Sequence, residues 1–225
     1  MSAATLSPPR ARAPIVSLEG PPAVGKTTLA RALAEQFGAT VIPELDASGA
    51  PSPREAEPWF TDRHAAAWQQ AERHAAQAPL VVMDGDPWKG LWYNWLHADE
   101  GWPGIDVVAP LCAAGITDGR LALPDLWFIL DADVDTLRAR RAGDPTRQRR
   151  NHDRHLMRLP MFSRYMQALA AIAPSRVVHL STQNRVLLPS QVMEQVAMLP
   201  PAPPTIRESH DVLTTIADWL RAQPR

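Results

Sequence analysis

The segment from Gly20 to Thr27 reads GPPAVGKT, which has the pattern G-x-x-x-x-G-K-[ST]. Glycine at positions 20 and 25 allows backbone geometry in which successive N–H groups turn inward around a phosphate. Lys26 adds a positive charge for the β- and γ-phosphates of a nucleotide, and the Thr27 hydroxyl can ligate Mg²⁺. We therefore expect this loop to bind ATP together with Mg²⁺. The expected contacts with the nucleotide are Gly20, Ala23, Val24, Gly25, Lys26, Thr27 and Thr28.

Two aspartates follow an apolar run at residues 79–83. Asp84 comes directly after the run, where a carboxylate at the end of a strand can hold Mg²⁺ directly or through water. We therefore expect Asp84 to take part in catalysis and to share the metal with Thr27. Asp86 lies two residues further on, and in an extended segment its side chain would point the same way as that of Asp84. Asp86 is open to two readings, a site residue or a turn residue before Pro87.

Glu44 follows a short apolar segment at residues 40–43 and should lie at the same edge of the sheet as Asp84. A carboxylate there can accept the proton of a substrate hydroxyl and orient it for attack on the γ-phosphate. We take Glu44 as the general base, with Asp86 as the second choice.

Arginine is concentrated between residues 138 and 158. Guanidinium groups bind phosphate oxygens bidentately and can stabilise the charge of a transferring phosphoryl group. The Gly-Asp-Pro sequence at residues 143–145 can act as a hinge, so we expect residues 143–158 to form a lid over the nucleotide. Spacing does not select among these arginines, and we take Arg138 as a nucleotide contact and Arg141 and Arg147 as catalytic. A solvated helix end and an RNA-binding patch are the alternatives.

The acceptor side of the site is less clearly marked. Trp88, Trp92 and Trp95 lie at helical spacing and are open to two interpretations, stacking on a ring of the acceptor or packing in the core. Arg63 and Gln70 lie near one face of a predicted helix at residues 59–77 and could face the same acceptor.

The elements that must position these residues alternate along the chain. Strands are expected at residues 15–18, 40–43, 79–84, 126–131 and 177–181, and helices at 26–37, 59–77, 134–142 and 162–172, with Asp133 as the N-cap of the third helix. This order predicts an α/β protein with the three-layer P-loop NTPase fold: a parallel sheet of about five strands, helices on both faces and an arginine-rich lid.

The composition excludes several classes of protein. A net charge of -1 and a pI near 6.7 argue against a nonspecific nucleic-acid binder. Cys112 is the one cysteine, so an internal disulfide and a cysteine-based zinc site are excluded. No apolar run approaches the ~20 residues that cross a bilayer, and the N-terminus has no apolar signal segment. We expect a cytoplasmic protein that does not bind membranes.

We divide the chain into three parts. Residues 1–13 are expected to be a flexible tail, residues 14–199 a P-loop kinase domain, and residues 200–225 a proline-rich linker with a C-terminal helix capped near Ser209. That helix could pack on the domain or on a second subunit, so a homodimer is left open.

The order of these features resembles the P-loop nucleoside and nucleotide kinases, in particular the thymidylate kinase and deoxynucleoside kinase group, over residues 15–181. The segment from Glu19 to Thr28 is similar to the EG-x-x-x-x-GK-[ST]-T opening of that group. Residues 41–44, VIPE, resemble a V-P-E-P stretch whose glutamate is the general base, which implies that role for Glu44. Residues 83–86, MDGD, occupy the place of a D/E-R-[SY] motif, and Gly85 stands where that motif has arginine.

The sequence thus favours an ATP- and Mg²⁺-dependent kinase that transfers the γ-phosphoryl group to a hydroxyl or phosphate of a small molecule. The expected acceptor is a nucleoside, a nucleotide, or a related ring-bearing metabolite or antibiotic. The alternatives are a P-loop ATPase and a nucleotide sensor without an acceptor. No N-K-x-D motif for guanine occurs in the chain, which weakens the GTPase branch.

Overall fold

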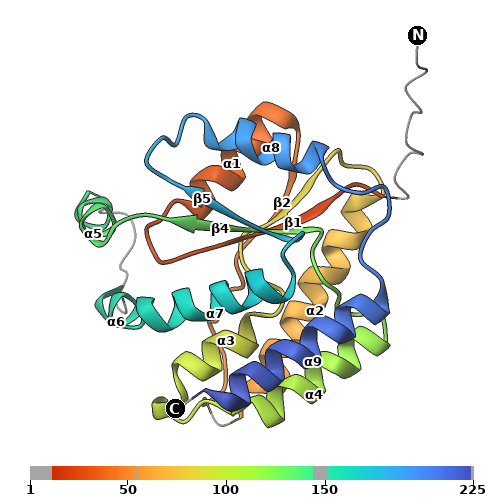
Figure 1. Ribbon diagram of the computed structural model, residues 1–225, viewed down its shortest axis with the longest axis vertical. Coiled ribbons are helices and arrows are strands. Elements are labelled where there is room, and N and C mark those ends of the chain that lie inside the picture. Colours follow the sequence, from red (N-terminus) through yellow and green to blue (C-terminus); the bar gives the residue numbers. More distant parts are fainter. Residues whose placement is uncertain (1–11, 54, 144–151, 224–225) are drawn as a thin grey trace.

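The computed structural model describes residues 12–53, 55–143 and 152–223. Parallel strands form its central sheet, in the order β2-β3-β1-β4-β5 (Figure 1). The strands are β1 (Ile15–Glu19), β2 (Thr40–Ile42), β3 (Val81–Met83), β4 (Leu126–Asp131) and β5 (Val177–Ser181). β1 and β3 are buried along their whole length, as expected for strands that carry helices on both faces. The predicted α/β fold with a five-stranded parallel sheet is confirmed.

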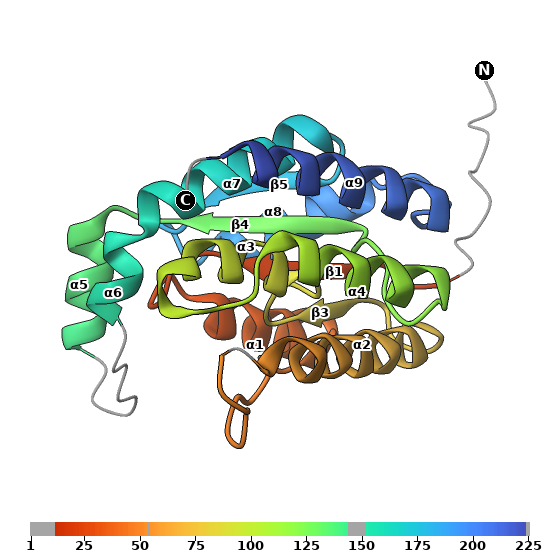
Figure 2. The same cartoon turned by 90° about the horizontal axis from the view of Figure 1, so that it is seen from below.

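Helices cover both faces of this sheet (Figures 1 and 2). One face carries α1 (Lys26–Phe37) and α8 (Leu188–Ala197). The other carries α2 (Ala56–Ala75), α3 (Lys89–Leu96), α4 (Ile105–Thr117), α7 (Leu159–Ile172) and α9 (Ile206–Ala222). The short helices α5 (Val134–Ala142) and α6 (His152–Met157) lie beyond one end of the sheet, and the 3-10 turn η1 (Ala98–Glu100) follows α3.

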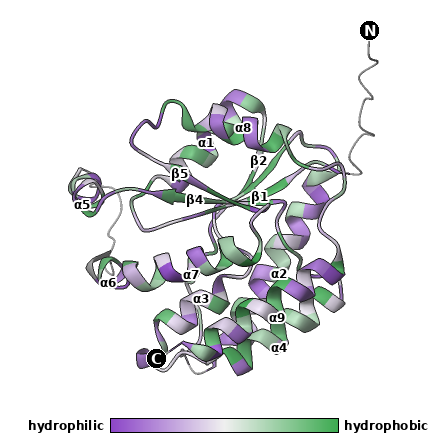
Figure 3. Ribbon diagram, viewed as in Figure 1, coloured by the Kyte–Doolittle hydropathy of each residue, from purple (hydrophilic) through white to green (hydrophobic). Residues whose placement is uncertain are grey.

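Alternate residues of a strand pack in two separate hydrophobic cores, because successive side chains of a strand point to opposite faces of the sheet. In β4, Trp127 and Ile129 join the core under α2, α3, α4, α7 and α9, whereas Phe128 and Leu130 join the core under α1 and α8. Colouring by hydropathy shows largely apolar strands at the centre, between helices of mixed character (Figure 3). The sheet is therefore a rigid platform whose C-terminal edge can position polar side chains.

Residues 12 and 13, which precede the expected domain boundary at residue 14, contact the domain. The Arg12 guanidinium is 2.7 Å from the buried carboxylate of Asp125, which also accepts a hydrogen bond from the N–H of Ile15. The N–H of Ala13 donates to the carbonyl of Ala75. Residues 12 and 13 thus belong to the fold rather than to the tail, and the rest of the predicted tail lies outside the described residues.

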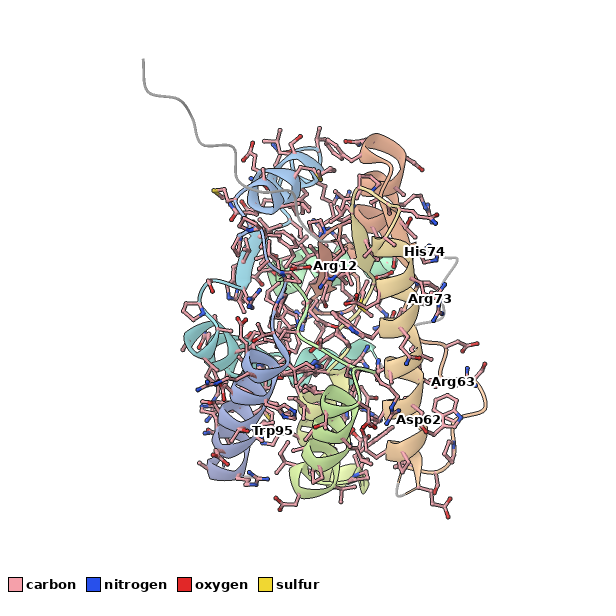
Figure 4. The ribbon with its side chains drawn as sticks, turned by 90° about the vertical axis from the view of Figure 1, so that its right-hand side faces the viewer. Arg12, Asp62, Arg63, Arg73, His74 and Trp95 are labelled. Atoms are coloured by element: carbon pink, nitrogen blue, oxygen red, sulfur yellow. The ribbon has the colours of Figure 1, made fainter. Side chains whose placement is uncertain are left out.

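The C-terminal helix α9 packs on the domain itself. Its apolar face, which includes Leu213 and Ile216, is buried in the core shared with α4 and α7, and Trp219 lies 5.6 Å from Trp95, which Figure 4 shows beside α9. The expected cap at Ser209 is wrong. The helix begins earlier, because the Thr205 hydroxyl accepts the N–H of Glu208, while Ser209 is buried inside the helix.

Other boundaries also differ. α2 begins at Ala56 rather than at residue 59, since Pro58 sits in the first turn, where its missing N–H is not needed. α7 begins at Leu159 rather than at residue 162. The helices α4 and α8 have no counterpart among the expected elements. The Asp133 cap is confirmed, because its carboxylate accepts the N–H of Thr136 at 2.7 Å. Among the described helices, none has the length and apolar character needed to cross a bilayer.

Candidate nucleotide-binding and catalytic site

The loop between β1 and α1 has the backbone that its glycines predict. Gly20 has φ 145°, and a Cβ there would lie 2.5 Å from the carbonyl oxygen of Leu130, so only glycine fits against β4. Gly25 has φ 116° and forms the N-cap of α1. Ala23 also has a positive φ, 69°, which is unfavourable for a residue with a Cβ. The loop is therefore held in a specific wound conformation at the N-terminal, positive end of a helix dipole.

This loop borders a cavity of about 1220 Å³. All residues expected to contact the nucleotide in the loop, from Gly20 through Thr28, line it. The Lys26 side chain curls back over the loop, and its Nζ donates to the carbonyl of Gly20 at 2.7 Å. An ammonium group and a helix N-terminus thus face the same space.

Thr27 and Asp84 meet beneath the loop. The Thr27 hydroxyl donates to Asp84 Oδ2 at 2.6 Å. Asp84 Oδ1 is buried and has no hydrogen-bond partner among the described residues, although a buried carboxylate oxygen normally has one. A hydroxyl oxygen beside an unpartnered carboxylate oxygen is an arrangement of hard oxygen ligands that suits Mg²⁺. The residues present therefore fit the metal expected here.

Glu19 and Gly85 fix the backbone on either side of Asp84. The buried Glu19 carboxylate accepts the N–H of Gly20 at 3.1 Å and that of Asp86 at 2.8 Å, so it ties the loop to the segment after β3. Gly85 has φ 143°, a conformation that side chains rarely adopt. The backbone conformation at position 85 therefore favours glycine.

Asp86 does not have the place expected of a catalytic base. Its carboxylate is buried and accepts hydrogen bonds from the N–H of Trp88 and from the indole N–H groups of Trp92 and Trp127. Neither Asp84 nor Asp86 is among the residues that line the large cavity, and both line a small pocket of about 30 Å³ together with Glu44 and Lys89. Burial, and next the charge of Glu19, raise the pKa of Asp86 to about 7. Of the two readings left open for Asp86, these contacts favour the structural one, in which its carboxylate holds three tryptophans in place.

Glu44 lines the cavity and is paired with a lysine that the sequence analysis did not select. Lys89 Nζ lies 2.9 Å from Glu44 Oε1. Burial alone would lower the pKa of Lys89, but the carboxylates of Glu19 and Glu44 raise it above the ordinary lysine value. Lys89 is thus a permanent cation beside Glu44. Its rarity was a usable signal, because Lys26 and Lys89 are the only lysines in the chain.

The arginines are arranged differently from the expectation. Arg138 is exposed and pairs with Asp135 at 3.3 Å, so it does not reach the loop. Arg141 is not among the residues that line the large cavity, and Arg147 lies outside the described residues. Arg140 instead donates to the carbonyl of Val24 in the loop at 2.9 Å. Of the described arginines, those lining the cavity are Arg31, Arg140 and Arg185.

The candidates for the acceptor side are also redistributed. Trp88 and Trp95 belong to the core, and Trp92 alone of the three borders the cavity. Arg63 and Gln70 lie on the exposed side of α2, and Figure 4 shows Arg63 directed away from the body of the molecule. Arg63 stacks on the ring of Trp59 at 4.7 Å. The expectation that these two residues face the acceptor is wrong.

Other residues of α2 and α3 line that side of the cavity, among them Glu57, His64 and Asn94. Glu57 is buried and accepts a hydrogen bond from the Asn94 amide at 2.6 Å. Burial, with a smaller effect from the charge of Lys89, lowers the pKa of His64 to about 3, so this imidazole is neutral at pH 7. Sequence reasoning missed these residues because they lie inside amphipathic helices with no motif around them.

Comparison with known proteins finds solved structures of similar fold. No curated protein matches the sequence significantly. A thymidylate kinase from Candida albicans aligns with a TM-score of 0.58 and 16% identity, covering 83% of this chain and 92% of that one. A deoxyadenosine kinase from M. mycoides, with dCMP and dCDP bound, aligns with a TM-score of 0.54 and 9% identity, covering 81% of this chain and 98% of that one. At these identities the likeness shows the fold.

The family of the chain is shown by the match of its sequence to a protein-family model. Residues 15–181, which run from the first strand to the last and include the phosphate-binding loop, match the AAA domain family. A P-loop domain of this kind implies the binding of a nucleoside triphosphate. The chain belongs to the AAA domain family, and its fold resembles that of nucleoside and nucleotide kinases.

Proposed function

We propose that the protein is an ATP- and Mg²⁺-dependent kinase that phosphorylates a hydroxyl group of a small molecule. The observation that carries this proposal is the position of Glu44, which lines the same cavity as Lys26 and the loop amides. A hydrolase needs room only for the nucleotide and a water molecule. This cavity has a volume of about 1220 Å³, which exceeds the ~300–1,000 Å³ of ordinary ligand sites. Such a volume accommodates a nucleotide and a second molecule.

In this proposal the loop amides and Lys26 bind the β- and γ-phosphates and fix the direction of the terminal P–O bond. Thr27 and Asp84 would hold Mg²⁺, which when bound neutralises charge on the phosphate oxygens. Arg140 braces the loop through the carbonyl of Val24. These residues position and stabilise charge rather than react, as phosphoryl transfer requires.

Glu44 acts on the acceptor. Its carboxylate accepts the proton of the acceptor hydroxyl as that oxygen bonds to the γ-phosphorus. The bond from the γ-phosphorus to the bridging oxygen breaks at the same time, and ADP leaves. Lys89, held 2.9 Å from Glu44, supplies a positive charge beside the reacting oxygens. As Glu44 takes up the proton, the attraction of Lys89 shifts toward the transferring phosphoryl group.

The test is ADP release by the purified protein in Mg²⁺ and ATP, with and without candidate acceptors. The panel contains nucleosides, nucleoside monophosphates and hydroxylated antibiotics, and Lys26→Ala gives the background. We expect turnover to rise at least tenfold with one acceptor class and to fall to background in the variant. Hydrolysis at the same rate with every acceptor would contradict the proposal and identify an ATPase.

A further inference from the structure

The cavity has a second, differently built side, which we call the acceptor wall and define as Glu57, Phe60, Tyr93, Asn94 and Trp102. Glu57 and Phe60 lie near the N-terminal end of α2, and Tyr93 and Asn94 are neighbours on α3. These helices cover the face of the sheet opposite to α1. The acceptor wall is therefore structurally independent of the phosphate-binding loop.

A carboxylate is built into this wall. Glu57 is 1% exposed, and its two oxygens accept hydrogen bonds from the Asn94 amide at 2.6 Å and the Thr61 hydroxyl at 3.2 Å. A Cβ at Gly90 would lie 2.6 Å from Glu57 Oε1, so the carboxylate rests against bare backbone of α3. An ionised carboxylate has about four acceptor positions. Glu57 can thus accept further hydrogen bonds from a ligand that enters the cavity.

Aromatic rings stand beside this carboxylate. The ring of Trp102 lies 5.6 Å from that of Phe60 and 5.1 Å from that of Tyr93. Such a cluster favours a planar ring over a flexible chain. Together with Glu57, it favours a ring that carries hydrogen-bond donors.

The described residues around the acceptor wall offer no unpaired positive charge that could bind a phosphate on the acceptor. Lys89 is matched by Glu44, His64 is neutral at pH 7, and Arg63 points away from the cavity. On the neighbouring segment, Arg154 and Arg158 pair with Glu100 at 2.6 Å and 2.8 Å. A phosphate ester here would meet the carboxylate of Glu57 without a compensating cation from the described residues.

We infer that the acceptor is an unphosphorylated ring-bearing alcohol whose ring carries an amino or N–H group, and that Glu57, held by Asn94, accepts a hydrogen bond from that group. Nucleosides with an amino-substituted base have all of these features. This inference rests on the proposed kinase function for the role of the ligand. It adds a specificity residue, Glu57, and the charges of the described residues favour nucleosides over nucleoside monophosphates as acceptors.

Matched ligands test the inference on the unaltered protein. Adenosine, purine riboside and AMP form one set, and cytidine, its analogue without the amino group and CMP form another. Binding is measured by calorimetry with Mg²⁺ and a non-hydrolysable ATP analogue, and phosphate transfer is measured in parallel with ATP. We expect the amino-bearing nucleoside of one set to bind at least tenfold more tightly than both of its partners, because one charge-assisted hydrogen bond gives about this factor.

Variants assign the effect to the carboxylate. In Glu57→Gln, the ratio of affinities for ligands with and without the amino group should fall at least tenfold. Glu194 is an exposed residue of α8, and the control variant Glu194→Gln should keep the ratio of the parent protein. Gly90→Ala should weaken binding in the same way, because its methyl group displaces the Glu57 carboxylate.

The outcomes separate the two proposals. Binding that depends on Glu57 without any transfer refutes the kinase but supports Glu57 as the residue that recognises the ligand. Transfer to monophosphates in preference to nucleosides, or a Glu57→Gln variant with unchanged preference, overturns the acceptor assignment and leaves the kinase standing. If no nucleoside binds, the acceptor assignment is also overturned.

Discussion

Lys89 Nζ lies 2.9 Å from Glu44 Oε1, and this ion pair joins the segment after β2 to the first residue of α3. The pair borders the cavity together with Lys26, so both lysines of the chain line the same space. In the proposed mechanism, the carboxylate that accepts the proton is thereby held next to a cation. We propose that the acceptor hydroxyl competes with Lys89 for Glu44 when the acceptor binds.

Loss of either member of this pair should slow transfer. We expect Glu44→Gln to lower kcat by about 10²–10⁴-fold, the usual effect of a general base. Lys89→Met should lower kcat by about tenfold or more, with Lys89→Arg closer to the parent protein. The double variant should lose less than the product of the two single effects, because the two groups act together. Steady-state kinetics of all four proteins measures this, and full activity of Lys89→Met would contradict the role given to that cation.

Asp84 should set the requirement for Mg²⁺. Removing its charge in Asp84→Asn leaves the Thr27 hydroxyl without its carboxylate partner, so the Mg²⁺ concentration for half-maximal activity should rise by about tenfold or more. Asp131→Asn is the matched control, because Asp131 also ends a strand but is exposed. A magnesium titration of turnover checks this. Equal magnesium curves for the two variants would show that Asp84 does not hold the metal.

Asp86 should make stability depend on pH. Its pKa of about 7 in the folded protein lies above the ordinary value of 3.8, so between these values the folded form retains a proton that the unfolded chain loses. The contribution of Asp86 to the free energy of unfolding is therefore present at pH 4 and lost as the pH rises to 7. Asp86→Asn cannot titrate, so its stability relative to the parent protein should increase over this range. Urea unfolding at a series of pH values measures it, and a pH-independent difference would contradict the shift.

The C-terminal helix should be required for stability of the whole domain. Ile216 is fully buried between α9 and the core, so Ile216→Ala should lower the free energy of unfolding by about 2–4 kcal/mol. Thr214→Ala, on the exposed side of the same helix, should change it by less than about 0.5 kcal/mol. Chemical denaturation compares the two. If Ile216→Ala were as harmless as its control, α9 would not be part of the cooperative unit.

Local patterns predicted the sheet and the phosphate-binding loop because their signals lie within a few residues. The apolar runs gave the strands, and Gly20, Gly25 and Lys26 together fix one backbone shape with its charge. Asp133 was predictable as a cap for the same reason, since its partner Thr136 is three residues away. Capping at Thr205 rather than at Ser209 depended instead on burial of Ser209 against Leu123, a contact between distant segments.

The rest of the site is made by contacts across the chain. The sequence left the role of Asp86 open because one of its partners, Trp127, comes from β4, 41 residues away. Arg140 could not be told from Arg138 and Arg141 by spacing, since only the fold brings its guanidinium to the carbonyl of Val24. Glu57 is typical of a helix surface in sequence, and only the packing of α2 on α3 turns it into a buried carboxylate.

Calorimetric titration of ATP in the presence of Mg²⁺ tests the central claim, that the loop amides and Lys26 bind the triphosphate. We predict that the parent protein and the control Arg73→Ala, altered on the outer side of α2, bind ATP equally (Figure 4). Lys26→Ala should bind at least tenfold more weakly, as expected for the loss of a charged hydrogen bond to phosphate. Unchanged affinity in Lys26→Ala would contradict the account.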